Sequence, residues 1–233
     1  MVGLKYKLIK DDTIEFRGET LYRIVALRTF GDVKEGDIGG YIEKESNLSH
    51  SGDAWVYENA RVCGDALICG DALICGDALI CGDARVYDNA RVYNNALVYG
   101  NARVYGNARV YGDALVYGDA LVYDSARVYG NAWVHDNAQV YGDVWVCGNA
   151  WVCGEAKVEL IGDYIVFKNW WSSGRYFTWT RSNNMWKAGC FYGTGEELVA
   201  RAYRDSEQSG REYKRVVDYV NGILAEQDSD ICP

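Results

Sequence analysis

The sequence predicts an all-β-dominated protein built around a parallel β-helix, a solenoid of short strands wound about a common core. Two observations carry this prediction. The chain of 233 residues repeats a six-residue unit such as Gly-Asn-Ala-Arg-Val-Tyr from about residue 52 to residue 159, without a break in register. It also holds 26 glycines but a single proline. Abundant glycine without proline indicates many tight turns of one kind rather than irregular loops.

Each six-residue unit predicts a short strand followed by a corner. Alanine occupies every sixth position from Ala54 to Ala156, with Val144 as the one exception, so there are eighteen units. Valine or isoleucine follows two residues later, and residues two apart on a strand point to the same side. The Gly, Asp and Asn residues that come next tolerate the backbone of a tight turn. A single unit cannot bury its apolar side, whereas stacked coils can.

This pattern resembles the hexapeptide repeat of the left-handed parallel β-helix, in which three units make one coil. The segment Val-Tyr-Gly-Asn-Ala-Arg meets the aliphatic-x-x-x-small-x rule of that family. The resemblance implies left-handed winding and about six coils, which gives a prism roughly 29 Å tall at a strand spacing of about 4.8 Å. Residues eighteen apart should therefore stack on one face of the prism.

A second resemblance covers residues 21 to about 160. Residues 21–57 read LYRIVALRTFGDVKEGDIGGYIEKESNLSHSGDAWVY. They are similar to the opening segment of the YdcK-like hexapeptide-repeat proteins, which carry an acetyltransferase label on the basis of fold. The C-terminal part of the chain resembles uncharacterised phage proteins, which implies an accessory or host-interfering role.

Three parts follow: an N-terminal cap over residues 1–47, the β-helix over 48–160 and a small α+β module over 161–233. In the cap we expect strands at 6–10 and 14–17, leading into 21–29 and a glycine-rich turn at 36–40. In the module we expect strands at 164–171, 176–181 and 186–192, then helices at 196–204 and 210–224. Thr194 and Glu197 have the spacing of a capping box for the first of these helices.

One face of the prism is expected to be an interface. The outward position after each alanine is apolar for five coils in one column, which holds Leu79, Leu97, Leu115, Trp133 and Trp151. A continuous apolar stripe on a surface indicates association. We therefore expect a homo-oligomer, and a trimer because hexapeptide-repeat proteins commonly form trimers. The alternative is a bare surface of stacked aliphatic side chains.

The candidate catalytic residue is His135, the only histidine on the coils from Gly52 onward. Acyltransferases with this fold use a histidine as a general base toward an acceptor hydroxyl or amine. Such enzymes also extrude a loop from the coils, and here the repeat is uninterrupted. We expect no metal, because two histidines are too few for a three-histidine zinc site. The cysteines turn to different faces, and only Cys63 and Cys81 should lie close together.

The candidate ligand site lies in the C-terminal module, where aromatic and basic residues alternate. It comprises Trp170, Arg175, Trp179, Arg181 and Trp186. Indole planes beside guanidinium groups suit a nucleotide, a base or a sugar. The alternative is that these aromatics form the core of a small sheet.

The preferred function is a non-catalytic oligomeric scaffold, without a cofactor, that presents the C-terminal module to a small ligand or a host protein. The alternative is an acyl(acetyl)transferase that uses acetyl-CoA. The net charge of −9 argues against direct nucleic-acid binding. No apolar run approaches the roughly 18 residues of a membrane span, and no signal peptide opens the chain. We expect a cytoplasmic protein of a bacterium or of a phage-infected host cell.

Overall fold

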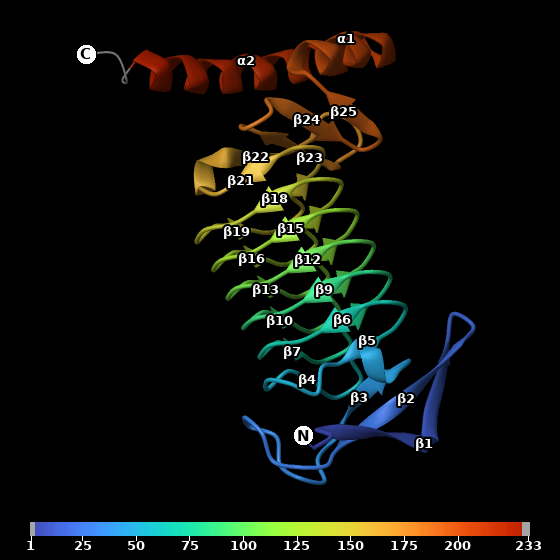
Figure 1. Cartoon of the computed structure of the whole chain (residues 1–233). Coiled ribbons are helices and arrows are strands. Elements are labelled where there is room, and N and C mark those ends of the chain that lie inside the picture. Colours follow the sequence, from blue (N-terminus) through green and yellow to red (C-terminus); the bar gives the residue numbers. More distant parts are fainter. Residues whose placement is uncertain (1–2, 230–233) are drawn as a thin grey trace.

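A computed structural model describes residues 3–229 and confirms the parallel β-helix (Figure 1). Three sheets form the three faces of the rod, and along the coils each is a parallel ladder of two-residue strands. The first sheet continues into three longer strands of the cap. The first sheet contains β5 (Arg61–Val62), β8 (Leu79–Ile80), β11 (Leu97–Val98), β14 (Leu115–Val116), β17 (Trp133–Val134) and β20 (Trp151–Val152). The second contains β4 (Trp55–Val56), β7 (Leu73–Ile74), β10 (Arg91–Val92), β13 (Arg109–Val110), β16 (Arg127–Val128) and β19 (Trp145–Val146). The third contains β6 (Leu67–Ile68), β9 (Arg85–Val86), β12 (Arg103–Val104), β15 (Leu121–Val122), β18 (Gln139–Val140) and β21 (Lys157–Val158).

The register between neighbouring coils is eighteen residues, as Leu97 pairs with Leu115 and Arg91 with Arg109. The solenoid has about seven turns rather than the six expected from the repeat alone. The additional turn comes from the cap, where strand β3 (Ile38–Ile42) pairs in parallel with β5. Leu48 also bridges to Ile68 on the third face.

The core of the rod is a column of small and branched side chains. The alanines from Ala54 to Ala156 are buried, and so is the valine or isoleucine two positions after each of them. The corners need positive φ: Gly112 has φ +72°, and a Cβ there would lie 3.0 Å from the backbone nitrogen of Gly130 on the next coil. Asp and Asn take the same conformation at other corners, for example Asn94 at φ +60°. The composition therefore follows from corner geometry.

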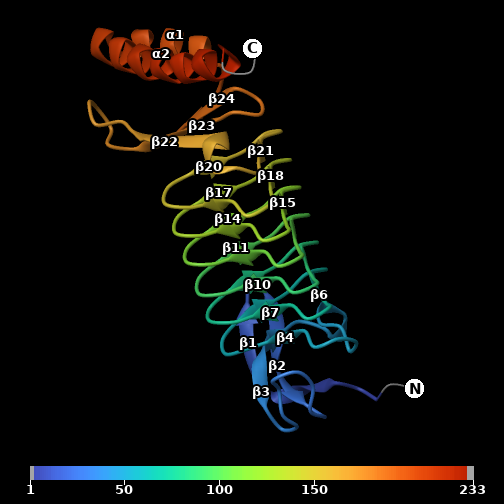
Figure 2. The same cartoon turned by 90° about the vertical axis from the view of Figure 1, so that its left-hand side faces the viewer.

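The N-terminal cap covers the lower end of the rod (Figures 1 and 2). Strand β1 (Tyr6–Phe16) is one strand with a register shift, not the two strands expected, and it pairs antiparallel with β2 (Glu19–Ala26). A 3-10 turn, η1 (Glu45–Asn47), leads into the coils. The glycine-rich segment 36–40, expected as a turn, is only partly a turn, because β3 begins at Ile38. Gly39 lies there because a Cβ would approach the carbonyl oxygen of Val56 to 2.6 Å.

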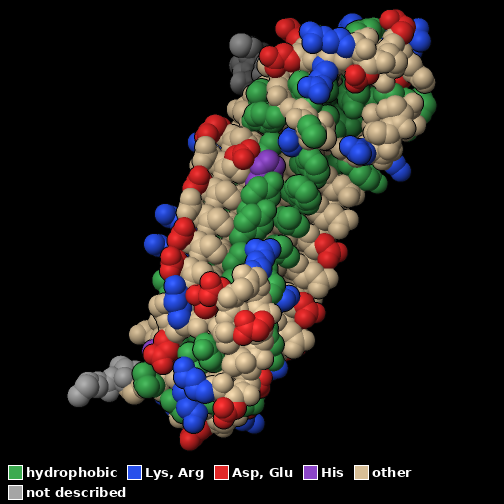
Figure 3. All heavy atoms as spheres, turned by 90° about the vertical axis from the view of Figure 1, so that its right-hand side faces the viewer, with side chains coloured by type: hydrophobic (Ala, Val, Ile, Leu, Met, Phe, Trp, Pro, Cys, Tyr) green, Lys and Arg blue, Asp and Glu red, His purple; other side chains and the backbone are tan. Residues whose placement is uncertain are grey.

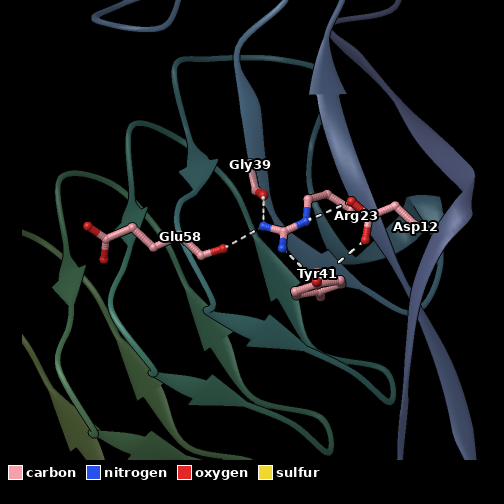
Figure 4. A network of polar contacts seen from close by, with 5 residues as sticks. All are labelled: Asp12, Arg23, Gly39, Tyr41 and Glu58. Atoms are coloured by element: carbon pink, nitrogen blue, oxygen red, sulfur yellow. Dashed lines mark hydrogen bonds and ion pairs between the residues drawn. The ribbon is translucent and has the colours of Figure 1, made fainter.

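A polar network fastens the cap to the first coil (Figure 4). Arg23 Nε lies 3.1 Å from Asp12 Oδ2, and Arg23 also donates to the hydroxyl of Tyr41 at 2.6 Å. The same guanidinium donates to the carbonyl oxygens of Gly39 and Glu58 at 3.2 and 3.1 Å. One arginine thus joins the hairpin, the cap strand and the first corner.

The C-terminal module is a four-stranded antiparallel sheet covered by two helices. After a 3-10 turn, η2 (Ile161–Asp163), come β22 (Tyr164–Lys168), β23 (Tyr176–Thr180), β24 (Met185–Ala188) and β25 (Phe191–Gly193), then α1 (Gly195–Asp205) and α2 (Glu207–Ser229). The strand expected at 186–192 is divided because Gly189 turns the chain at φ +58°. The capping box of Thr194 and Glu197 is confirmed. Within residues 3–229, no helix has both the length and the apolar character that crossing a bilayer requires.

The module replaces the coil that would follow the last one. The amide of Trp151 donates to Thr178 Oγ1 at 2.9 Å, and the amide of Lys157 donates to Ser182 Oγ at 2.6 Å. The hydroxyl of Tyr164 donates to the carbonyl oxygen of Trp145 at 2.8 Å. These bonds satisfy backbone groups that would otherwise be unpaired at the end of a solenoid.

Cys63 and Cys81 test the eighteen-residue register. They lie on adjacent coils, so the strand spacing places their Cα atoms about 4.8 Å apart. This distance is within the range of Cα separations found in disulfides. The hydrogen bond that Cys63 shares with Cys81 lowers the pKa of Cys81, which favours the thiolate form that attacks an oxidant. We expect the oxidant diamide to close a Cys63–Cys81 disulfide, detected by peptide mass mapping. A dominant bridge between Cys63 and Cys69, one unit apart, would contradict the register.

Candidate functional site

The outward residues of the first sheet form a continuous apolar surface between the cap and the C-terminal module (Figure 3). All five predicted interface residues stack in this one column. Four of them, Leu97, Leu115, Trp133 and Trp151, are half-buried and are called the apolar stripe below. Leu79 differs from the prediction because its side chain is only 5% exposed. It packs with Leu21 of the cap in a cluster that also contacts Phe16, so it is covered by its own chain.

A column of aromatic side chains runs beside the apolar stripe. The rings of Tyr99 and Tyr117 stack with centroids 4.8 Å apart, and Tyr117 stacks on His135 at the same separation. Cys153 lies beside His135 on the next coil, where the amide of His135 donates to the carbonyl oxygen of Val152 at 3.0 Å. Burial raises the pKa of the Cys153 thiol to about 12. The indoles of Trp133 and Trp151 stack 4.7 Å apart. Such stacks stabilise neighbouring strands and hold every ring in a fixed position.

His135 follows strand β17 and is only 7% exposed. Its Nδ1 lies 3.1 Å from Oδ2 of Asp136, which occupies the adjoining corner at φ +58°. The same carboxylate oxygen accepts the amide of Gly154 at 3.2 Å. Burial acts to raise the pKa of Asp136, but the hydrogen bonds from His135 and Gly154 outweigh it and lower that pKa. The carboxylate therefore remains ionised and orients the imidazole.

The module contributes side chains to the same region. Lys187 places its Nζ 5.4 Å from the ring centroid of Trp151. Burial raises the pKa of Cys153 and the charge of Lys187 only partly offsets it, whereas the same charge adds to the lowering of the pKa of Asp136. The hydroxyl of Tyr192 lies against Gly154, at a position where a Cβ could not fit. Tyr192 accepts a hydrogen bond from Asn183 Nδ2 at 3.2 Å. His135 is thus enclosed by groups from two coils and from the module.

The aromatic ligand site proposed from the sequence is not assembled as a unit. Trp179 and Trp186 are 1% and 2% exposed and form the core beneath the helices with Phe177, Leu198 and Val217. These two indoles therefore cannot line a ligand pocket, because the α1–α2 layer covers that side of the sheet. Trp170 is 71% exposed and lies apart from them. Arg181 donates its amide to the carbonyl oxygen of Asp163, beside the last coil.

Arg175 has a different setting from the one expected. It lines a depression of about 370 Å³ with Trp151, Tyr176, Asn149 and Gly189, where the module meets the last coil. An indole, a phenol and a guanidinium group therefore converge at the upper end of the apolar stripe. Sequence reasoning missed this combination, because Trp151 belongs to the repeat and Arg175 to the module.

The sequence analysis did not predict four of the residues around His135 as members of a site: Asp136, Cys153, Lys187 and Tyr192. The eighteen-residue period does place residue 153 on residue 135, so that contact had a signal in the sequence. No pattern in the sequence indicates that Lys187 and Tyr192 approach this region, because their positions depend on how the module docks on the last coil.

The fold defines this protein as a β-solenoid. Its repeats match the family model described as YdcK Beta solenoid repeat in seven segments: 84–100, 90–103, 96–111, 102–118, 108–124, 114–130 and 138–154. This part of the chain is therefore similar to the YdcK β-solenoid repeat. His135 and Asp136 fall between the last two matched segments. A search of curated proteins found no match to the chain.

Trp179 and Trp170 test the placement of the module core. Replacing Trp179 with Ala should lower the free energy of unfolding of the module by about 3–5 kcal/mol, the usual cost of emptying a buried indole site. Replacing the exposed Trp170 with Ala should change it by no more than about 0.5 kcal/mol. Urea titration followed by circular dichroism measures both. Equal losses in the two variants would mean that Trp179 is not a core residue.

Proposed function

We propose that the protein is a non-catalytic scaffold that associates with further copies of itself through the apolar stripe and presents the C-terminal module to a ligand or a partner protein. The observation that carries the proposal is the continuity of the stripe over four successive coils. A half-exposed apolar surface of this length is unfavourable in water unless something covers it.

The other two faces support this reading by contrast. In the same outward position, the second face holds Arg91, Arg109 and Arg127, and the third holds Arg85 and Arg103. An arginine there keeps a solenoid face in contact with water and disfavours close packing. Between Leu79 and Trp151 the first face has no charged residue in this position. Its composition differs from that of its neighbours although its backbone is the same.

The shape of the surface supports a partner that is narrow and rod-like. The stripe lies between the cap hairpin at one end and the module at the other (Figure 3). Three rods that turn their uncharged faces toward a common axis would bury all three stripes, so we propose a trimer. The modules then lie at one end of the assembly, each with the depression formed by Trp151, Arg175 and Tyr176. That combination suits a planar or anionic group on a ligand or a host protein, and the resemblance of the module to phage proteins favours an accessory role.

The double variant Leu97→Glu/Leu115→Glu tests the association. Wild-type protein should elute with a light-scattering mass that is a multiple of 26.1 kDa, expected to be three. The variant should elute as a monomer with an unchanged circular dichroism spectrum, because two buried carboxylates per chain cannot be tolerated at an interface. The matched control is Leu67→Glu/Leu121→Glu, which places the same charges on the third face and should remain associated. Wild-type protein that is already monomeric would refute the proposal.

Acyl transfer from acetyl-CoA is the second candidate, and the pairing of His135 with Asp136 is the observation that favours it. A carboxylate on Nδ1 fixes the tautomer in which Nε2 can accept a proton, as a general base requires. The uninterrupted coils disfavour it, since β4 to β21 follow one another without an inserted loop that could shape an acceptor site. Calorimetric titration of acetyl-CoA into wild-type protein and His135→Ala decides between the two candidates. Binding that depends on His135 supports the enzyme, and no binding to the wild type supports the scaffold.

A further inference from the structure

Three potential metal ligands of different chemistry meet beside the apolar stripe. A nitrogen of His135, a carboxylate oxygen of Asp136 and the sulfur of Cys153 all lie within 4.8 Å of one another. His135 and Cys153 are buried, whereas Asp136 reaches the surface. They come together because the eighteen-residue register stacks position 153 on position 135, and because Asp136 occupies the corner that follows His135.

We propose that His135, Asp136 and Cys153 form a binding site for a zinc ion. Imidazole nitrogen, thiolate sulfur and carboxylate oxygen are the three donor types that zinc takes from proteins, and zinc is satisfied with three of them plus a small fourth ligand. Calcium and magnesium would require a set of oxygen ligands, which this cluster does not offer. The donor chemistry therefore selects a borderline-soft divalent ion.

The distances fit a tetrahedral ion after a small adjustment. With metal–ligand bonds of about 2.0–2.3 Å, tetrahedral ligand atoms lie about 3.3–3.6 Å from one another. His135 Nδ1 and Asp136 Oδ2 are already 3.1 Å apart. The sulfur lies within 4.8 Å of both of these atoms, so it needs to approach them by about 1.5 Å at most. On binding, the thiol of Cys153 releases its proton to solvent. The imidazole gives up the Nδ1 proton that faces Asp136 and takes one from solvent on Nε2, so the neutral ring ligates through Nδ1.

The surroundings hold two of the ligands in place before any ion arrives. One face of the His135 imidazole stacks on Tyr117, with the two rings 9° from parallel. Asp136 is anchored by the amide of Gly154. Lys187 lies nearby, with its Nζ 5.4 Å from the ring centroid of Trp151. Ligands that are ordered in advance lose little conformational freedom when they bind.

Cobalt(II) is the probe, because it occupies zinc sites and its thiolate charge-transfer and visible bands report sulfur ligation and tetrahedral geometry. Full-length protein treated with a chelator and a reductant, then titrated with cobalt chloride, should show both bands with an end point of one ion per chain. Zinc chloride should displace the cobalt and abolish the bands. It should also raise the melting temperature of the metal-free protein, as any ligand of the folded state does.

Three variants that preserve the fold identify the ligands. Cys153→Ser should lose the charge-transfer band. His135→Tyr introduces the residue found one coil earlier at Tyr117, and Asp136→Asn introduces a residue that Asn94 shows to be compatible with such a corner. Each should weaken binding by at least about tenfold, the loss typical of residues that only support a ligand. The matched control is Cys147→Ser, which removes a thiol from the neighbouring column and should change nothing.

The proposal is overturned if wild-type protein shows no thiolate band, or if the band survives in Cys153→Ser. It is equally overturned if Cys147→Ser abolishes the band. The inference is independent of the scaffold function, because association is measured by mass and metal binding by the cobalt spectrum. A monomeric protein that binds cobalt, or an associated protein that does not, would separate the two.

Discussion

The structure depends on one constraint, the stacking of each residue on the residue eighteen positions later. Backbone bonds such as that from the amide of Leu97 to the carbonyl oxygen of Ala114, at 3.0 Å, repeat along all three faces. They are strong only if every coil has the same length, and an equal length requires a small residue inside and positive φ at the corners. Alanine, glycine, aspartate and asparagine recur for this reason. Each outward position then becomes a column, so one surface property extends along the whole rod.

The same constraint creates a problem at both ends, where a coil has no neighbour. The protein solves it differently at each end. At the lower end, the core is closed by Tyr6, Phe30 and Trp55, while Lys5 is fully buried and donates its ammonium protons to the carbonyl oxygens of Gly52 and Ala54. Burial lowers the pKa of Lys5 to about 8. At the upper end, the hydroxyl groups of Thr178 and Ser182 in the module accept hydrogen bonds from backbone amides of the last coil.

The regular part of this architecture could be predicted from the sequence because its signal is repeated eighteen times. The inward alanines follow from the six-residue period alone. The three columns and the proximity of Cys63 to Cys81 also require three units per coil, which the resemblance to hexapeptide repeats implies. The covering of Leu79 could not be predicted, since it depends on where the β1–β2 hairpin folds back. The fate of Trp179 and Trp186 was equally hidden, because an alternating aromatic strand looks the same whether helices cover it or water does. The region around His135 contains both kinds of residue. The eighteen-residue register predicts that Cys153 lies beside His135, whereas the positions of Lys187 and Tyr192 depend on how the module docks.

The central claim is that the eighteen-residue coil, not the six-residue unit, determines function by keeping one face apolar. Two deletions compared by light scattering test it most directly. Removal of residues 84–101 takes out one whole coil and leaves Leu79, Leu115, Trp133 and Trp151 in one column, so the shortened protein should fold and associate. Removal of residues 114–119 preserves the six-residue repeat but divides the stripe between two faces. It places Leu121, Gln139 and Lys157 above Leu97, and it moves Trp133 and Trp151 above Arg109. This protein should fold and remain monomeric. Association of both proteins to the same extent would contradict the account.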